Sequence, residues 1–221
     1  MKHFFIILLI LPLLSTAQFF DTDEVEWLPH SVGEKKWRPL VGFDSRRSFF
    51  QGRNVKFLGL RFGAEHRKVH RFGLAFFGLR DGDSYDDVSI DREDAPPDAQ
   101  ADFNVSFATL FYERVIMKAG PWEMSTPIYF GGGRMIGEYR STTGQIKTFL
   151  DEDFSVLGGG IMLKYRVLPW LEPGLGGGYR HAFDSEKEVK KTLQQPYYVI
   201  KVSVLLGELY RSFIRGEDTQ L

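Results

Sequence analysis

The chain has 221 residues, a formal net charge of -1 and no cysteine. The nearly neutral charge argues against a nucleic-acid surface, and the absence of cysteine excludes disulfides and thiolate metal sites. A hydrophobic content of 43% fits a soluble domain, but it also fits a barrel whose lumen and loops are polar. The 20 Phe, 9 Tyr, 4 Trp and 23 Gly are residue types that barrels use at membrane interfaces and tight backbones.

The N-terminal residues predict an export signal. After a basic start, an apolar run extends from Phe4 to Leu14 and is followed by small residues at Ser15–Ala17. Eleven apolar residues are too few for a spanning helix, which needs about 20. We therefore expect residues 1–17 to be a cleaved signal peptide, with cleavage before Gln18. Residues 18–36 would then form a periplasmic N-terminal segment.

Eight segments that resemble strands follow, joined by connections that are alternately short and long. Most span about ten residues or more, which suits tilted membrane strands. They are predicted at Trp37–Arg46, Val55–Glu65, Arg71–Arg80, Asp102–Ile116, Trp122–Arg140, Phe154–Arg166, Leu171–Phe183 and Tyr197–Tyr210. Short turns at one rim and long loops at the other predict an all-β fold, an eight-stranded antiparallel up-and-down transmembrane β-barrel. We place this outer-membrane β-barrel at residues 37–213 and a periplasmic tail at 214–221.

Apolar residues alternate with small, polar or charged ones along these segments. In the last segment, Val202 and Val204 should face lipid and Lys201 the lumen. In the fourth segment the apolar face, expected to meet lipid, contains Phe103, Val105, Phe107, Phe111 and Val115. The fifth segment is the least regular, because its proline should interrupt the ladder and a bulge at Gly131–Gly133 would reset its facing.

Aromatic residues gather at the short-turn rim of this map. Trp37, Trp122 and Trp170 begin strands there, and Tyr165 and Tyr210 end strands there, as in an interfacial girdle. Alternation alone also fits a soluble β-protein with an apolar core. The girdle, the strand length and an inner face of small and charged residues favour the membrane barrel.

Glycine-rich strands at Tyr129–Gly133 and Gly174–Tyr179, behind a signal ending Ser-Thr-Ala-Gln, resemble small bacterial outer-membrane barrels. The resemblance is to the OmpA/OmpX-like group, in particular to the PorT-like outer membrane protein β-barrel domain. It covers roughly Trp37–Phe213 and rests on pattern. It implies location in the cell outer membrane, contact with outer-membrane lipids, assembly by the barrel assembly machinery, and roles in envelope integrity, surface contact or secretion. It supplies no catalytic residues.

An enzymatic alternative centres on His181, which is followed by Asp184 and Ser185. Barrel lipid A deacylases resemble this arrangement, but their His and Ser are two residues apart on one strand face, and here Phe183 occupies that position. A nucleophile needs its base within hydrogen-bond reach. We therefore predict no enzyme, and assign no catalytic, cofactor-binding or metal residues. A lipid-modifying outer-membrane enzyme using His181 stays as an alternative.

Two groups of charges invite further interpretation. Charged residues expected in the lumen are Arg61, Glu65, Arg114, Arg134, Glu138, Arg140, Lys164, Arg166, Glu172, Arg180 and Lys201. Because eight strands enclose little more than side chains, we interpret them as a salt-bridge network, and an ion path is the alternative. The loop Asp81–Gln100 holds eight acidic residues, which suggests a calcium hypothesis. Its spacing does not match an EF-hand, and acidic surface loops are usually solvated.

These observations predict a non-enzymatic outer-membrane β-barrel protein with an envelope structural or surface-interaction role through its extracellular loops, chiefly Asp81–Gln100. The alternatives are a narrow pore or accessory component of a secretion or transport system, and the enzyme. We expect a monomer without cofactor, with a surface or secretion-system protein as partner and no nucleic acid.

Overall fold

The computed structural model describes residues 25–27, 37–50, 53–79, 101–183, 190 and 193–215. The strands are β1 Val25–Trp27, β2 Trp37–Phe50, β3 Arg53–His66, β4 His70–Leu79, β5 Ala101–Ala119, β6 Trp122–Arg140, β7 Ile146–Tyr165, β8 Leu171–Phe183 and β9 Pro196–Leu205. A short helix, α3 (Leu206–Tyr210), continues into a π-helical turn, η2 (Arg211–Arg215). Among the described residues, no helix is long and apolar enough to cross a membrane.

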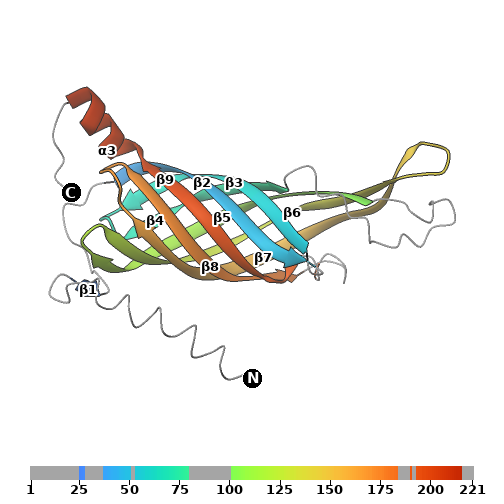
Figure 1. The fold of residues 1–221 in the computed structure, drawn as a ribbon, viewed down its shortest axis with the longest axis horizontal. Helices are drawn as coiled ribbons and strands as arrows, with labels where there is room; N and C mark the ends of the chain where they lie inside the picture. Colours follow the sequence, from blue (N-terminus) through green and yellow to red (C-terminus); the bar gives the residue numbers. More distant parts are fainter. Residues whose placement is uncertain are drawn as a thin grey trace, which may run out of the picture.

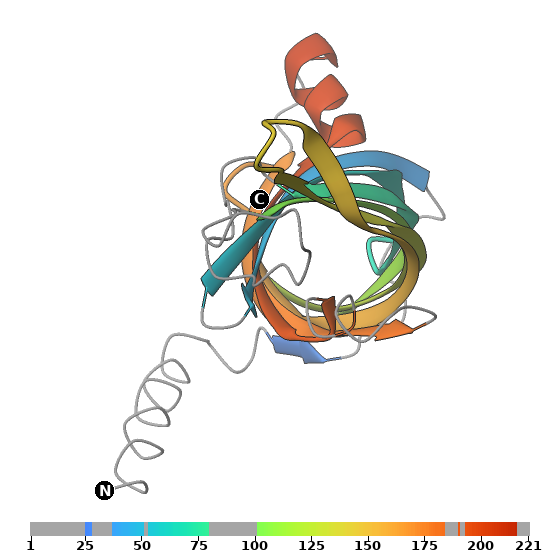
Figure 2. The ribbon, with the colours of Figure 1, turned by 90° about the vertical axis from the view of Figure 1, so that its right-hand side faces the viewer.

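Strands β2 to β9 form a closed ring. Each pairs antiparallel with its neighbours in the chain, and β9 returns to pair with β2, from Leu40 opposite Leu205 to Ser48 opposite Tyr197. Figure 2, which looks along the barrel, shows this ring. Closure leaves no unpaired edge in the ring. The predicted eight-stranded antiparallel up-and-down barrel is confirmed.

One strand lies outside the ring and was not predicted. Strand β1 pairs antiparallel with the end of β5, with Val25 opposite Ala119 and Trp27 opposite Met117. The ladder between β5 and β6 has a register irregularity between Val115 and Met117, next to this pairing. Part of the expected N-terminal segment is therefore held against the short-turn end of the barrel (Figure 1).

The outer wall of the ring is apolar. Leu110 and Leu175 expose 62% and 63% of their surface there. Other large apolar side chains exposed on this wall are Leu60, Phe62, Leu74, Phe76, Phe130, Leu157, Ile161 and Ile200. The buried face instead carries Arg61, Lys164 and Lys201. Apolar side chains outside and charges inside are the reverse of a soluble barrel and the arrangement of a transmembrane one.

The aromatic girdle is present at the short-turn rim. The rings of Trp122 and Tyr165 lie 4.8 Å apart, and Trp37 packs edge-on against Phe72 at 5.2 Å. Tyr210 is an exception, because β9 ends at Leu205 and Tyr210 belongs to helix α3. The prediction of a last strand reaching Tyr210 was wrong.

The predicted facing of β5 was inverted. Phe107 and Phe111 are buried inside the ring, as are Val105 and Val115, while Phe103 packs against the same core. The large apolar side chains that this strand exposes are Leu110 and Tyr112. The reason lies in Glu113, which shares the inner face with Phe111 and cannot be placed in lipid without a large cost.

The hairpin of β6 and β7 is longer than predicted. Strand β7 begins at Ile146 rather than at Phe154, so β6 and β7 have 19 and 20 residues. Their outer parts extend beyond the ends of the other strands, on the right in Figure 1. The predicted bulge at Gly131–Gly133 is absent from the β6–β7 ladder, whose register shifts at Gly137 instead. Pro127 pairs with β5, but its pairing with β7 is missing, because proline has no N–H to donate.

Candidate functional site

The half of the lumen next to the short turns holds a network of buried ion pairs, with Glu113 at its centre. Glu113 is completely buried and accepts hydrogen bonds from Lys201 Nζ at 2.6 Å and from Arg61 Nη1 at 3.3 Å. Lys164 is a third partner, and Arg71 Nη1 a fourth at 3.4 Å. Four cations therefore share one carboxylate of β5.

Arg71 of β4 is the second centre. Its Nε donates to Glu65 at 2.8 Å, and its Nη2 donates to Glu123 Oε2 at 3.1 Å and to Glu172 at 3.2 Å. Arg61 Nη1 also lies 4.0 Å from Asp44 Oδ2 on β2. The network, called the charge network below, comprises Asp44, Arg61, Glu65, Arg71, Glu113, Glu123, Lys164, Glu172 and Lys201. Each of the eight ring strands contributes at least one member.

The predicted salt-bridge network is thus confirmed, but with different members. Lumen positions are correct for Arg61, Glu65, Lys164, Glu172, Arg180 and Lys201, and Arg166 pairs with Glu172 at 2.7 Å. Lumen positions are wrong for Arg114, Arg134, Glu138 and Arg140, because the alternation buries their neighbours instead. Five charged lumen residues were not predicted from the sequence, namely Asp44, Arg46, Arg71, Glu113 and Glu123. Two of them, Glu113 and Glu123, lie before and after the turn at Gly120 and Pro121. An acidic residue on each side of this turn was the signal that the sequence offered.

The half of the lumen next to the long loops is filled differently. Phe77 stacks on Phe107 with ring centroids 4.9 Å apart, and Phe57 packs edge-on against Phe107 at 5.7 Å. We call the set Phe57, Phe77, Phe107, Tyr129, Phe154 and Tyr197 the aromatic plug. Leu193, from the connection between β8 and β9, is fully buried against it. This apolar filling was not predicted from the sequence.

Two buried arginines lie within the aromatic plug. The Arg46 guanidinium stands 4.0 Å from the Phe77 ring centroid and 3.3 Å from Asp44 Oδ2. Arg180 lies 5.0 Å from the Phe57 ring centroid, and its Nε donates to the Leu193 carbonyl at 2.7 Å. Cation–π contacts of this kind strengthen when water is excluded. Together the charge network and the aromatic plug place side chains of the described residues in both halves of the lumen.

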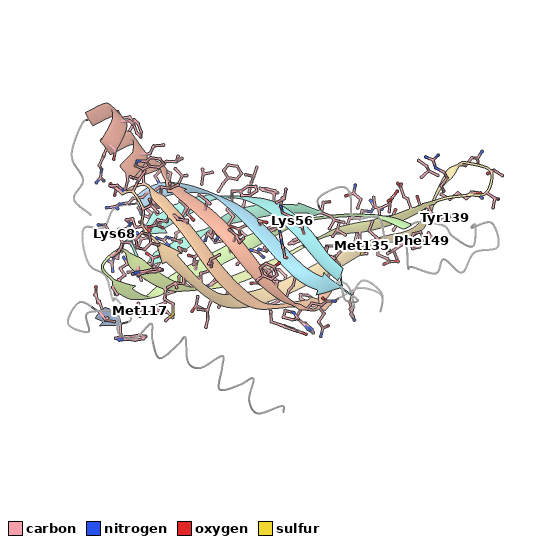
Figure 3. All side chains as sticks on the ribbon, viewed as in Figure 1. Lys56, Lys68, Met117, Met135, Tyr139 and Phe149 are labelled. Carbon is pink, nitrogen blue, oxygen red and sulfur yellow. The ribbon has the colours of Figure 1, made fainter. Side chains whose placement is uncertain are left out.

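The projecting hairpin, Arg134–Asp151, is the most prominent described feature on the long-loop side. At its base, Arg134 Nε and Nη2 donate to the two carboxylate oxygens of Asp151 at 2.6 and 2.8 Å. Aromatic side chains stiffen it, since the ring of Phe149 lies 6.1 Å from that of Tyr139 and 5.6 Å from that of Phe103. Figure 3 labels Tyr139 and Phe149 on the projection and Met135 nearer the ring.

The tip of the projecting hairpin is a short polar turn. The Ser141 amide donates to the Gln145 carbonyl at 2.8 Å, and Gly144 adopts a φ of +82°. Ile146, directly after the turn, exposes two thirds of its surface. The tip therefore presents polar groups and one large apolar side chain to the solvent.

At the base of the hairpin the outer wall is hollowed. A recess of about 510 Å³ lies between Phe76 of β4 and Asp153 of β7. Ser106, Ala108 and Gly132 leave this space open because their side chains are small or absent. The recess marks the boundary between the apolar wall and the polar hairpin.

The remaining sequence candidates do not join a site. His181 is exposed on the outer wall, away from the charge network, and its ring lies 6.3 Å from that of Phe183. Asp184, Ser185 and the loop Asp81–Gln100 lie outside the described residues, as do residues 1–24. Within the described ranges, no group of three or more His, Asp or Glu side chains is placed to hold a metal ion.

Ring closure, the apolar outer wall and the charged, side-chain-filled lumen define a small transmembrane β-barrel. No family model matches the chain, and no curated protein sequence matches it.

Several solved structures resemble it in shape. Neisserial surface protein A (NspA) has 12% identity and a TM-score of 0.41, over 76% of this chain and 96% of that one. Ail, the attachment invasion locus protein of Yersinia pestis, has 14% identity and a TM-score of 0.43, over 77% and 97%. A major outer membrane protein from Thermus thermophilus has 14% identity and a TM-score of 0.46, over 75% and 97%. All three TM-scores are below 0.5, so the fold assignment rests on the ring of strands itself.

Proposed function

We propose that this chain is a non-enzymatic outer-membrane barrel protein with an envelope structural or surface-interaction role, and that it acts through what it presents outside the cell. The observation that carries the proposal is a lumen filled by the charge network and the aromatic plug, beneath a hairpin that projects past the rim (Figure 1). A barrel filled in this way serves as a rigid support for its outer segments.

The filling argues against the pore alternative. An ion crossing the lumen would have to pass Glu113 and its four cations and then the stacked rings of Phe77 and Phe107. Eight-stranded barrels have interiors that side chains alone can fill. We also propose that the protein is a monomer surrounded by outer-membrane lipids. A cleaved signal at residues 1–17 would deliver it, and the barrel assembly machinery would insert it.

The outward-facing segments carry the proposed activity. The projecting hairpin supplies a stiff, mainly polar surface, and the acidic loop Asp81–Gln100 joins β4 to β5 on the same side of the barrel. A surface or secretion-system protein would be recognised there, and no step of this role requires a cofactor. His181 is exposed on the outer wall, and the side chain that it meets among the described residues is the ring of Phe183, which is no nucleophile for it to activate.

Complementation of a strain that lacks the gene separates the two parts of this role. The wild-type chain is compared with a hairpin variant in which residues 138–149 are replaced by a two-residue Asn-Gly turn between the paired residues Gly137 and Leu150, and with a variant that lacks residues 83–94. A structural role predicts that all three restore resistance to detergent. A surface role predicts that only the wild type restores attachment or aggregation of cells. If every variant restores both phenotypes, the outward segments are not the active part and the proposal fails.

A further inference from the structure

The C-terminal helical segment leaves the barrel in an unexpected direction. Helix α3 and turn η2, together Leu206–Arg215, begin where β9 ends at the short-turn rim. In Figure 1 the segment rises away from the long axis of the barrel, and in Figure 2 it points outward from the ring. The segment therefore leaves the wall obliquely, both outward from the ring and past the short-turn rim.

One side of the segment is apolar and exposed. Tyr210 and Phe213 expose 53% and 72% of their surface, and Leu206 is exposed one turn earlier. Spacings of four and three residues place such side chains on one face of a helix. The ring of Phe213 lies 5.9 Å from that of Trp170, which belongs to the girdle. The apolar face thus continues the girdle away from the barrel.

The opposite side fixes the segment to the ring. Glu208 is buried and forms an ion pair with Arg38 of β2, and Arg211 Nη1 lies 3.5 Å from its second carboxylate oxygen. This attachment holds the orientation of the helix. The exposed apolar face is consequently held in a defined orientation relative to the ring.

We propose that Leu206–Arg215 is an interfacial anchor whose apolar face lies in the head-group region of the periplasmic leaflet, with phospholipid as its occupant. The turn before β8 supports this occupant, because Val167 and Leu168 are also exposed at the same rim. The apolar face is continuous with the lipid-facing wall, and aromatic residues favour this depth of a bilayer. The anchor would set the depth and tilt of the barrel in the membrane.

The absence of native cysteine allows a direct test in the full chain, refolded into phosphatidylcholine vesicles. Phe213→Cys and, separately, Tyr210→Cys carry an environment-sensitive fluorophore, and Ser212→Cys is the matched control. Folding of each variant is checked by heat-modifiable migration in gels. The expected result is blue-shifted emission at positions 210 and 213 that is quenched several-fold more strongly by lipids with a head-group nitroxide than at position 212.

Two results would overturn the proposal. Equal, water-like emission at positions 210, 212 and 213 would show that the apolar face does not enter the bilayer. A blue shift that appears only as the protein-to-lipid ratio rises would assign the face to a second copy of the chain. Neither result affects the complementation test, so the anchor and the surface role are tested independently.

Discussion

The two halves of the lumen are both filled by side chains, but one filling is charged and the other is mainly aromatic. Beside the short turns, the charge network fills the interior and joins all eight strands through Glu113 and Arg71. Beside the long loops, the aromatic plug fills it and surrounds the two buried arginines Arg46 and Arg180. The difference shows that the inside of a small barrel need not be uniformly polar. Side chains must fill the interior, and each buried charge needs a partner that offsets the cost of removing it from water.

The largest expected effect comes from breaking the charge network at its centre. Glu113→Ala leaves Arg61, Arg71, Lys164 and Lys201 without their shared carboxylate. Removing one partner of a buried ion pair costs about 3–5 kcal/mol, and we expect a loss in this range in the free energy of unfolding. Urea titration in lipid vesicles measures it. Glu138→Ala, on the projecting hairpin, is the matched control and should cost less than about 0.5 kcal/mol.

The aromatic plug should respond by loss of packing rather than by unpaired charge. Phe107→Ala removes the ring that stacks on Phe77 and touches Phe57, and we expect a cost of about 3 kcal/mol. The more conservative Phe107→Leu should cost about 1 kcal/mol. The same titration gives both values. A neutral Phe107→Ala, with Glu113→Ala still severe, would confine the structural role of the lumen to the charge network.

The contrast between inside and outside is tested along one strand. Leu110→Arg puts a charge on the apolar outer wall of β5 and should cost about 2–4 kcal/mol, whereas Asn104→Arg, on the same face nearer the long-loop rim, should cost about 0–1 kcal/mol. Leu110 and Asn104 are both exposed. If Phe111→Arg were the tolerated change instead, the facing of β5 in the structure would be wrong.

The smallest effect belongs to the projecting hairpin. Arg134 pairs with Asp151, but both side chains are about half exposed, so water screens the pair. Arg134→Ala should change stability by about 0–1 kcal/mol and leave the barrel folded. Thermal unfolding in detergent is sufficient to measure it. A cost near that of Glu113→Ala would mean that Arg134 supports the ring, as expected from the sequence and not found in the structure.

The sequence predicted the ring well because alternation and connection length act over whole strands. It correctly placed Arg61, Lys164 and Lys201 inside, since each interrupts an otherwise apolar strand. It failed on β5, where both faces are partly apolar and only Glu113 reveals which one is inside. A strand whose inner face belongs partly to an apolar plug cannot be oriented by hydrophobicity alone.

The end of β9 shows a second limit of sequence patterns. Val202 and Val204 lie on the lipid side as predicted, but β9 ends at Leu205, so Val204 is near the rim and not near mid-strand. Leu206 and Tyr210 continue the same apolar spacing into a helix. Spacings of four residues fit one face of a strand and one face of a helix equally well.

The most direct test of a filled lumen is the current that the purified, refolded protein passes in a planar lipid bilayer. A filled lumen predicts no steady single-channel steps for the wild-type chain. It also predicts that deletion of residues 83–94 creates none, because the filling comes from the ring strands and Leu193. Steady steps from the wild-type protein, altered by Glu113→Ala or Phe107→Ala and unaffected by the loop deletion, would contradict a filled lumen and show that the barrel is a pore.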